Sequence, residues 1–362
     1  MTSFHTIKWL NPGLVSMIDQ RKLPHDVIYN EYQDPAAVAG AIKDMVIRGA
    51  PAIGAAAAYG LALVPWHDET GSLANVCQKL EGAAQILRES RPTAVNLFWA
   101  IDRMMALVEE IDYSSVAELK ERLLKEALQI AEEDVETNKA IGRNALPLIP
   151  DGAVIFHHCN TGSLAAVDYG TALGIIRLAH EEGKNVFAFV DETRPRLQGG
   201  RLTAWELLQY GVPFKVVADS ASGHYMRTQR VDLCVVGTDR VAANGDVANK
   251  IGTYNLAVVA HENKVPFYVA VPKTTIDMKT PSGDQIEIEE RPAEEVTHVG
   301  SWQITPDGTP VGNPAFDVTP AKYVTAFITE DGVVYPPYEE NLAKLFRDPR
   351  KSKLNNLKAD EE

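Results

Sequence analysis

The second half of the chain alternates short β-branched or aromatic runs with amphipathic segments, and this alternation limits the possible folds more than any other feature. The runs are AVIFHH (153–158), NVFAFVDE (185–192), PFKVVADS (213–220), DLCVVGTD (232–239) and PFYVAVP (266–272). The segments with helical spacing are 163–183, 201–211, 221–230 and 250–264. Because parallel strands need a crossover connection, usually a helix, this order predicts a Rossmann-like parallel sheet.

The first half has a different pattern. From Pro35 to about Leu146, apolar residues recur at helical spacing, which predicts a layer of helices. Residues 1–34 carry short extended runs broken by Asn11-Pro12-Gly13 and Leu23-Pro24, which predict a small strand-rich start. We therefore expect an α/β protein, with a mainly helical N-terminal domain at 1–146 and a Rossmann-like catalytic domain at 147–362.

Composition and charge narrow the class of protein. Of 362 residues, 45% are hydrophobic and 23% are charged, which is typical of a globular protein. The net charge of −14 argues against binding to nucleic acid or to an anionic membrane, because both require a basic face. The chain has no uninterrupted apolar run of about 18 residues, and its first residues do not resemble a signal peptide. We expect a cytoplasmic protein with a small-molecule substrate.

The carboxyl ends of the predicted strands should carry the site, since ligands of open parallel sheets bind there. The residues at these ends are Cys159, Glu192 to Arg194, Asp219-Ser220, Asp239-Arg240 and Pro272-Lys273. From its position alone, Cys159 could be a nucleophile, a metal ligand or an inert buried thiol. His157 and His158 would point to opposite faces of a strand, which argues against a shared metal.

Three arginine-containing stretches suggest an anion site. RGAP (48–51) places Arg48 beside Gly49, a possible C-cap, and beside a helix opened by Pro51. SRPT (90–93) places Arg91 before Pro92, and TRPRLQGGR (193–201) adds Arg194, Arg196 and a Gly-Gly turn. In an acidic protein these features favour a bound phosphate, although arginine and proline are also common at helix starts that bind no ligand.

Common cofactor motifs are missing from the sequence. It has no CxxC pair, no HExxH, no GxGxxG after a strand and no GxxxxGK[ST]. We therefore expect no metal and no nucleotide cofactor, and the three cysteines should be reduced thiols.

Several long segments taken together resemble the methylthioribose-1-phosphate isomerases, a family of methionine-salvage enzymes related to the regulatory subunits of eukaryotic translation initiation factor two B. The segments include MVIRGAPAIGAAAAYG (45–60), HHCNTGSLAAVDYGTALGIIR (157–177), DETRPRLQGGRLTAWEL (191–207) and GTDRVAANGDVANKIGTYNLAVVAH (237–261). The resemblance covers nearly the whole chain. It implies an enzyme that converts 5-methylthioribose 1-phosphate to 5-methylthioribulose 1-phosphate, in a homodimer without a cofactor.

The resemblance also assigns residues. Cys159 and Asp239 match the family's catalytic pair. The positions matching its substrate-binding residues are Arg48, Gly49, Ala50, Arg91, Gln198, Asn249 and Lys250. Two other activities stay open: isomerisation of ribose 1,5-bisphosphate, and a noncatalytic regulatory role like that of the initiation-factor subunits. The residues do not decide between proton and hydride transfer, and the resemblance favours hydride.

Overall fold

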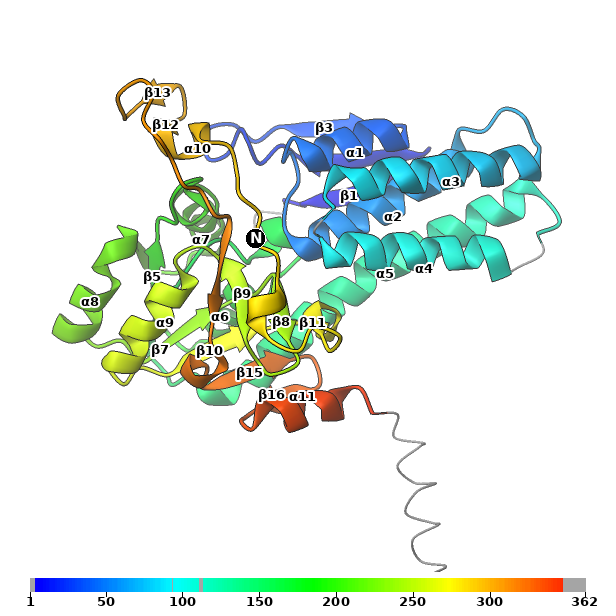
Figure 1. Cartoon of the computed structure of the whole chain (residues 1–362). Coiled ribbons are helices and arrows are strands. Elements are labelled where there is room, and N and C mark those ends of the chain that lie inside the picture. Colours follow the sequence, from blue (N-terminus) through cyan, green and yellow to red (C-terminus); the bar gives the residue numbers. More distant parts are fainter. Residues whose placement is uncertain (1–3, 93, 111–112, 348–362) are drawn as a thin grey trace, which may run out of the picture.

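The computed structural model describes residues 4–92, 94–110 and 113–347. The chain starts with a three-stranded antiparallel sheet in the order β1 (Ile7–Leu10), β2 (Leu14–Ile18) and β3 (Tyr29–Tyr32). Trp9, Val15 and Met17 of this sheet belong to the same apolar core as the helices that follow. The expected strand-rich start is therefore present, packed against the helical layer (Figure 1).

The helical layer contains α1 (Pro35–Lys43), α2 (Ala50–Trp66), α3 (Leu73–Ser90), α4 (Val95–Glu110) and α5 (Val116–Ala145). Polar side chains cap several of these helices: Asp34 accepts a hydrogen bond from Ala37 N, and Ser115 from Glu118 N. Helix α2 is apolar around its whole circumference and is surrounded by α1, α3, α4 and α5. Such a helix is stable only inside a core, so its amino end is fixed within the protein.

The first helix is shorter than its sequence pattern predicts. Apolar spacing continues to Ile47, but α1 ends at Lys43 because Met45 adopts a left-handed conformation with φ 57°. Gly49 consequently does not cap α1. It is the N-cap of α2, which begins at Ala50.

The second half forms a seven-stranded sheet in its described residues, with the order β16-β15-β10-β7-β4-β5-β6. Its strands are β4 (Val154–His157), β5 (Phe187–Asp191), β6 (Phe214–Val217), β7 (Leu233–Val236), β10 (Phe267–Ala270), β15 (Ala326–Thr329) and β16 (Gly332–Val334). All neighbours pair in parallel except β16, which pairs with β15 antiparallel. The expected Rossmann-like sheet is confirmed, with two strands at its end that the sequence pattern did not predict.

Helices cover both faces of this sheet. One face packs against α6 (Ala172–Glu181), α7 (Ala204–Tyr210) and the end of α5, and the other against α8 (Ser222–Thr228), α9 (Thr253–Glu262) and α11 (Tyr338–Leu345). Successive strand residues face opposite sides: Ile155 joins the first core and Phe156 the second. Burial on both faces explains why these strands are apolar throughout.

The strand order reverses between β4 and β7. From β4 the chain moves outward through β5 and β6, and it then returns to β7 on the other side of β4. The loops after β4 and β7 therefore diverge, which opens a crevice at the carboxyl ends of the strands. Cys159 follows β4 and Asp239 follows β7.

Helix α5 contributes to two cores along its length. Leu119, Leu123 and Ala127 pack in the core of the first helices, whereas Ile141 and Ala145 pack with the central sheet. The division of the chain near residue 147 stays a prediction. Among the helices of residues 4–92, 94–110 and 113–347, none is long and apolar enough to span a bilayer.

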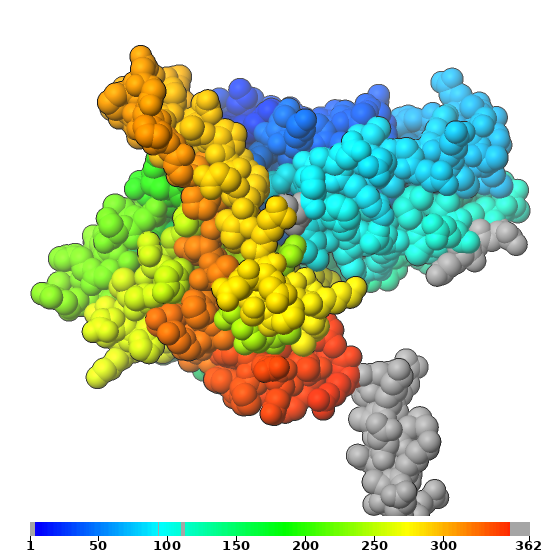
Figure 2. Space-filling model, in the orientation of Figure 1, coloured from blue at the N-terminus to red at the C-terminus, as the bar shows by residue number. Residues whose placement is uncertain are grey.

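A smaller sheet and a long excursion follow the central strands. The sheet has the order β11 (Ile276–Asp277), β8 (Arg240–Ala242), β9 (Val247–Lys250) and β14 (Phe316–Thr319). Residues 283–315, here called the arm, carry α10 (Glu294–Thr297), β12 (His298–Val299) and β13 (Trp302–Gln303). Figure 2 shows the arm, yellow to orange, lying over the junction between the blue-cyan helices and the green part of the chain.

Candidate active site

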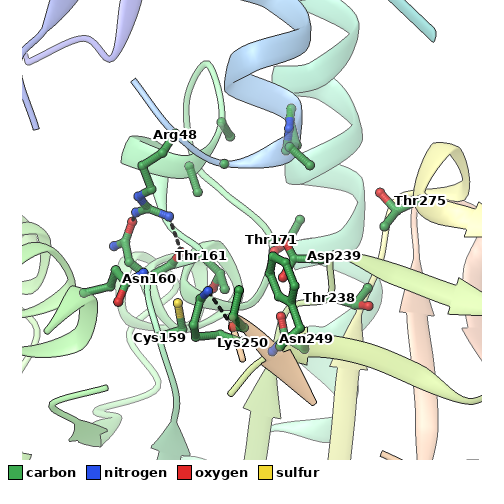
Figure 3. A pocket seen from close by; sticks show the side chains of 18 of the residues that line it. Arg48, Cys159, Asn160, Thr161, Thr171, Thr238, Asp239, Asn249, Lys250 and Thr275 are labelled. Carbon is green, nitrogen blue, oxygen red and sulfur yellow. Dashed lines mark hydrogen bonds between the residues drawn. The ribbon is translucent and has the colours of Figure 1, made fainter. Parts of the chain in front are cut away.

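One cavity between the helical layer and the central sheet collects the residues expected at the site. Its lining includes Arg48, Gly49, Ala50, Arg91, Cys159, Gln198, Asp239, Asn249 and Lys250. The labelled side chains of Cys159, Lys250 and Asp239 follow one another across this cavity (Figure 3). Their roles stay predictions, but their positions in one hollow follow from the strand-order reversal and from the fixed start of α2.

Cys159 is held in an unusual backbone conformation. Its φ is 67°, in the left-handed region that residues other than glycine rarely adopt. Two threonine side chains fix the residue, since Cys159 N donates to Thr193 Oγ1 at 2.9 Å and its carbonyl accepts from Thr203 Oγ1 at 2.7 Å. Burial raises the pKa of the Cys159 thiol, against the opposing effects of Arg48 and Lys250. The side chain is therefore a protonated thiol at neutral pH.

Asp239 lies in the bend between β7 and β8. Its backbone N donates to Ala248 O at 3.0 Å, which ties the bend to β9. Burial raises the pKa of its carboxyl group, and Lys250, Arg91 and Arg48 act in the opposite direction. A raised pKa makes the protonated form of the carboxyl group more accessible, so that Asp239 can donate as well as accept a proton.

Strand β9 carries two further residues of the cavity, Asn249 and Lys250. Lys250 Nζ donates to Ala315 O at 2.7 Å and lies 4.3 Å from the centre of the Phe316 ring. Burial lowers the pKa of Lys250, while Cys159 and Asp239 act to raise it. The neighbouring Asn249 donates to Thr253 Oγ1 at 3.0 Å, which orients its amide.

The amino end of α2 supplies the opposite wall. Gly49 has φ 101°, and a Cβ atom there would lie 2.3 Å from Ala165 O, so both its conformation and its packing require glycine. The residue before it, Arg48, donates to Gln20 Oε1 at 3.1 Å and to Asn160 O at 2.9 Å. The positive amino end of α2 therefore borders the cavity beside a fixed guanidinium.

The remaining two expected residues face the cavity with unused polar groups. Among the described residues, the Arg91 side chain has no hydrogen-bonding partner, and Gln198 Oε1 is buried without a donor. Burial lowers the pKa of Arg91, though the group remains a cation. Both side chains are available to a ligand.

Comparisons with known proteins identify the family of this chain. The chain matches the family described as the initiation factor 2 subunit family over residues 46–336. "Methylthioribose-1-phosphate isomerase 2" of Pseudothermotoga lettingae is 54% identical over 346 residues, covering 96% of this chain and 99% of the relative. The chain belongs to the methylthioribose-1-phosphate isomerase family. A relative of the same name from Synechococcus is 53% identical over 349 residues, covering 96% of this chain and all of the relative.

Solved structures show the same fold. The 5-methylthioribose 1-phosphate isomerase of Pyrococcus horikoshii superposes with a TM-score of 0.91 at 46% identity, covering 96% of each chain. A chain from A. fulgidus, titled subunit delta of translation initiation factor eIF-2B, superposes with a TM-score of 0.86 at 44% identity, covering 95% of this chain and 99% of that one. The expected family and fold are therefore confirmed.

Several cavity residues escaped the sequence reasoning. Asn160, Glu289, Arg291 and Phe316 line the cavity, as does Arg196 from the arginine-rich stretch. Glu289 and Arg291 belong to the arm, where Arg291 donates to both oxygens of Glu295 at 2.9 and 2.7 Å. No strand or helix pattern surrounds them in the sequence, so only a local cluster of charges (IEIEERPAEE, 286–295) could have drawn attention to them.

Other expectations at the rim were wrong. Arg194 donates to Pro195 O and Val296 O rather than lining the cavity, and Lys273 pairs with Asp331. Glycine is required at position 199 because the backbone of β5 packs against it, and not because a ligand approaches it: a Cβ atom there would lie 1.7 Å from Asp191 O. Phe98 packs on the helical core and Trp99 borders a separate cavity, so neither is among the residues that line the cavity described here.

The two histidines before Cys159 are structural. His157 Nδ1 bonds Val235 O at 2.8 Å. His158 Nδ1 bonds Asp191 Oδ2 at 2.8 Å and its Nε2 bonds Ile251 O at 2.9 Å. His158, Asp191 and Asp219 have the donor types of a metal site, but Asp219 accepts from Thr193 N and Arg194 N. These groups form a hydrogen-bond network that joins the ends of β4, β5 and β9.

Proposed function

We propose that this chain is an aldose-ketose isomerase that converts 5-methylthioribose 1-phosphate to 5-methylthioribulose 1-phosphate in methionine salvage. The observation that carries the proposal is that Cys159, a buried thiol, and Asp239, a partly buried carboxyl group, line one cavity together with several cations. The relatives at 51–54% identity, all bearing this activity in their names, support it.

The phosphate would lie against the cationic end of the cavity. Arg48, Arg91 and Lys250 contribute positive charge there, and the first N–H groups of α2 add hydrogen-bond donors. Gln198 and Asn249 would orient the sugar. This arrangement also explains how a chain with a net charge of −14 attracts an anionic substrate.

The methylthio end would occupy a second compartment that opens from the same cavity. Both spaces are bordered by Gly49, Ala50, Arg91, Asp239, Glu289 and Phe316. Beyond these residues the compartment is lined by the apolar side chains Ile53, Val95, Ile286 and Ile288 and by the charged residues Arg240 and Glu287, among others. The apolar side chains suit a thioether, and the carboxylates Glu287 and Glu289 disfavour the second phosphate of ribose 1,5-bisphosphate.

The reaction must open the sugar ring although phosphate blocks the anomeric oxygen. We infer that Asp239, in its neutral form, donates a proton to the ring oxygen as the bond from C1 to that oxygen breaks. Hydrogen then moves from C2 to C1, and the resulting carboxylate accepts the proton of the C2 hydroxyl as the ketone forms. Asp239 thus ends neutral, ready for another cycle.

Cys159 would stabilise charge in the transition state or relay a proton. Its thiol is protonated, so it can donate a hydrogen bond to an oxygen that becomes negative. A hydride shift within the substrate suits the buried cavity, because it needs no base at C2 and no solvent.

Purified protein incubated with the substrate in deuterated water tests the proposal. We expect the ketose to form, and a hydride shift would leave C1 without solvent deuterium, whereas proton transfer would introduce it. Asp239→Asn and Cys159→Ser should each fold and lose at least about a hundredfold in kcat, the lower range for acid-base groups. Near-normal turnover in either variant would remove that residue from the mechanism.

A parallel assay with ribose 1,5-bisphosphate tests which of the two sugars is the substrate. We expect turnover of the bisphosphate to be at least about tenfold slower, because its second phosphate would be desolvated beside the apolar residues and the carboxylates Glu287 and Glu289 of the second compartment. Faster turnover of the bisphosphate, or none of either sugar, would favour the alternative activities. We further propose a cytoplasmic homodimer, which analytical ultracentrifugation would test.

A further inference from the structure

Two buried acceptor atoms at the cavity have no donor among the residues that the structure describes: Gln198 Oε1 and Glu289 Oε2. A buried acceptor without a donor is costly, and proteins keep such atoms mainly where a ligand or an ion supplies the missing contact. Gln198 already has an assignment to the substrate through the family resemblance. Glu289 has none, so its free oxygen requires an explanation of its own.

The rest of the Glu289 side chain is firmly held. Arg291 Nη1 donates to Glu289 Oε1 at 2.8 Å, and Arg291 is itself fixed by Glu295. The Glu289 carbonyl accepts from Ala315 N at 2.8 Å, and the Ala315 carbonyl accepts from Lys250 Nζ at 2.7 Å. One carboxylate oxygen is thus occupied and the backbone is tied to a cavity lysine, which leaves Oε2 as the unused acceptor.

Glu289 also lies between the two spaces proposed above for the phosphate and for the thioether. It borders both the main cavity and the second compartment, together with Asp239 and Phe316. The residues shared by the two spaces form a neck between them. When the phosphate of the substrate lies near Arg48 and its thioether in the second compartment, the middle of its carbon chain lies in this neck. The C1 and C2 atoms react beside Asp239, so the hydroxyl left at the neck is the one on C3.

We propose that Glu289 accepts a hydrogen bond from the C3 hydroxyl of the substrate and thereby selects sugars that carry this group. The Glu289 side chain is 29% exposed, and the proposal includes a rotation about its soft final torsion that brings Oε2 to the substrate. Arg291 is a positioning residue that fixes the other oxygen. The inference rests on the proposed function, because it needs the substrate orientation given above.

Glu289 could instead act only as a counter-charge for Arg91, since its charge raises the pKa of the Arg91 guanidinium. The two roles differ in one measurable respect. A counter-charge would affect every substrate of the enzyme alike, whereas a hydroxyl acceptor matters only when the hydroxyl is present. A substrate lacking the C3 hydroxyl therefore separates them.

The experiment measures kcat/KM for 5-methylthioribose 1-phosphate and for its 3-deoxy analogue, in the unaltered enzyme and in Glu289→Gln and Glu289→Leu. We expect the unaltered enzyme to lose about 10- to 100-fold on the 3-deoxy analogue, the usual effect of a hydrogen bond to a charged group. In both variants, kcat/KM for the natural substrate should fall by a similar factor, because the charged acceptor is gone. The kcat/KM values of each variant for the two sugars should then differ by less than about threefold. Glu294→Gln, which removes an exposed carboxylate from the same arm, should retain the discrimination of the unaltered enzyme.

The outcomes separate this inference from the proposed function. If the unaltered enzyme does not convert the natural substrate, the proposed function fails. If it does, but both Glu289 variants keep the full discrimination against the 3-deoxy analogue, the inference is wrong. Circular dichroism of each variant excludes misfolding, and a folded Glu289→Gln enzyme alone suffices if Glu289→Leu does not fold.

Discussion

Arg48 donates two hydrogen bonds to Asn160, the residue that follows Cys159: Nη1 binds the Asn160 carbonyl at 2.9 Å, and Nη2 binds its side-chain Oδ1. These residues are 112 positions apart in the chain. The Asn160 amide in turn donates to Glu206 Oε1 at 2.8 Å and to Thr203 Oγ1 at 3.1 Å. The guanidinium of Arg48, just before α2, is thus hydrogen-bonded to the loop that carries Cys159.

Replacing Asn160 should disturb both stability and substrate binding. Asn160→Ala leaves Glu206 and Arg48 with unpaired buried groups, so we expect the free energy of unfolding to fall by about 1–3 kcal/mol. The KM should rise because Arg48 loses its fixed position. Denaturant unfolding and steady-state kinetics measure the two effects. Asn144→Ala is the control, because it removes hydrogen bonds to Thr329 O and Glu330 O away from the cavity. Its stability should fall while its KM stays constant. A change of KM in Asn144→Ala would contradict the assigned role of Asn160.

The Cys159 thiol should react slowly with alkylating reagents at neutral pH. Since burial raises its pKa, the thiolate fraction is small and grows about tenfold per pH unit until the pKa is passed. Inactivation by iodoacetamide, followed by activity and by peptide mass spectrometry, should therefore accelerate beyond pH 9 and slow when inorganic phosphate is added. Cys234, in the core of the sheet, should remain unmodified. Rapid modification of Cys159 at pH 7 would instead indicate a stabilised thiolate.

Arg91 should contribute mainly to substrate capture. Its guanidinium has no protein partner among the described residues, so Arg91→Ala should remove contacts to the phosphate without breaking the fold. We expect KM to rise about 10- to 100-fold while kcat changes much less, as for loss of uniform binding. Arg88→Ala, which breaks the pair with Asp102 on the surface of α3, is the matched control. An unchanged KM in Arg91→Ala would place the phosphate elsewhere.

Asp134 on α5 should make stability depend on pH. Burial raises the pKa of its carboxyl group to about 7, although Val167 N donates to it at 2.7 Å. In the unfolded chain the pKa returns to its ordinary value of 3.8, so between these values the folded protein binds the extra proton. The contribution of this group to stability is therefore full below about pH 4 and is lost as pH rises through 7.

The variant Asp134→Asn removes this titration and can still accept the bond from Val167 N. Its melting temperature relative to the unaltered protein should consequently be higher at pH 8 than at pH 5, measured by calorimetry. Glu132→Gln, an exposed position on the same helix, should show no such change. If the difference for Asp134→Asn is equal at both pH values, the carboxyl group is not protonated in the folded state.

Much of the fold was predictable because it depends on local periodicity. The β-branched runs after residue 153 became the parallel strands β4, β5, β6, β7 and β10, and the positions at their ends placed Cys159 and Asp239 at the rim. The boundaries were less predictable. Helix α1 ends at Lys43, shortly before Met45, whose left-handed backbone is not favoured by its residue type.

The sequence by itself determined the order of the elements, the apolar helix α2 and the residue types at each strand end, since hydrophobic spacing and turn chemistry act between near neighbours. Only the tertiary structure decided which of those residues meet. The arm brings Glu289 and Arg291 over the cavity, and Arg291 contacts Met45 Sδ at 3.8 Å across 246 positions. The physical reason is that such contacts form between surfaces that exist only after the sheet and helices have packed, and no local pattern in the chain encodes them.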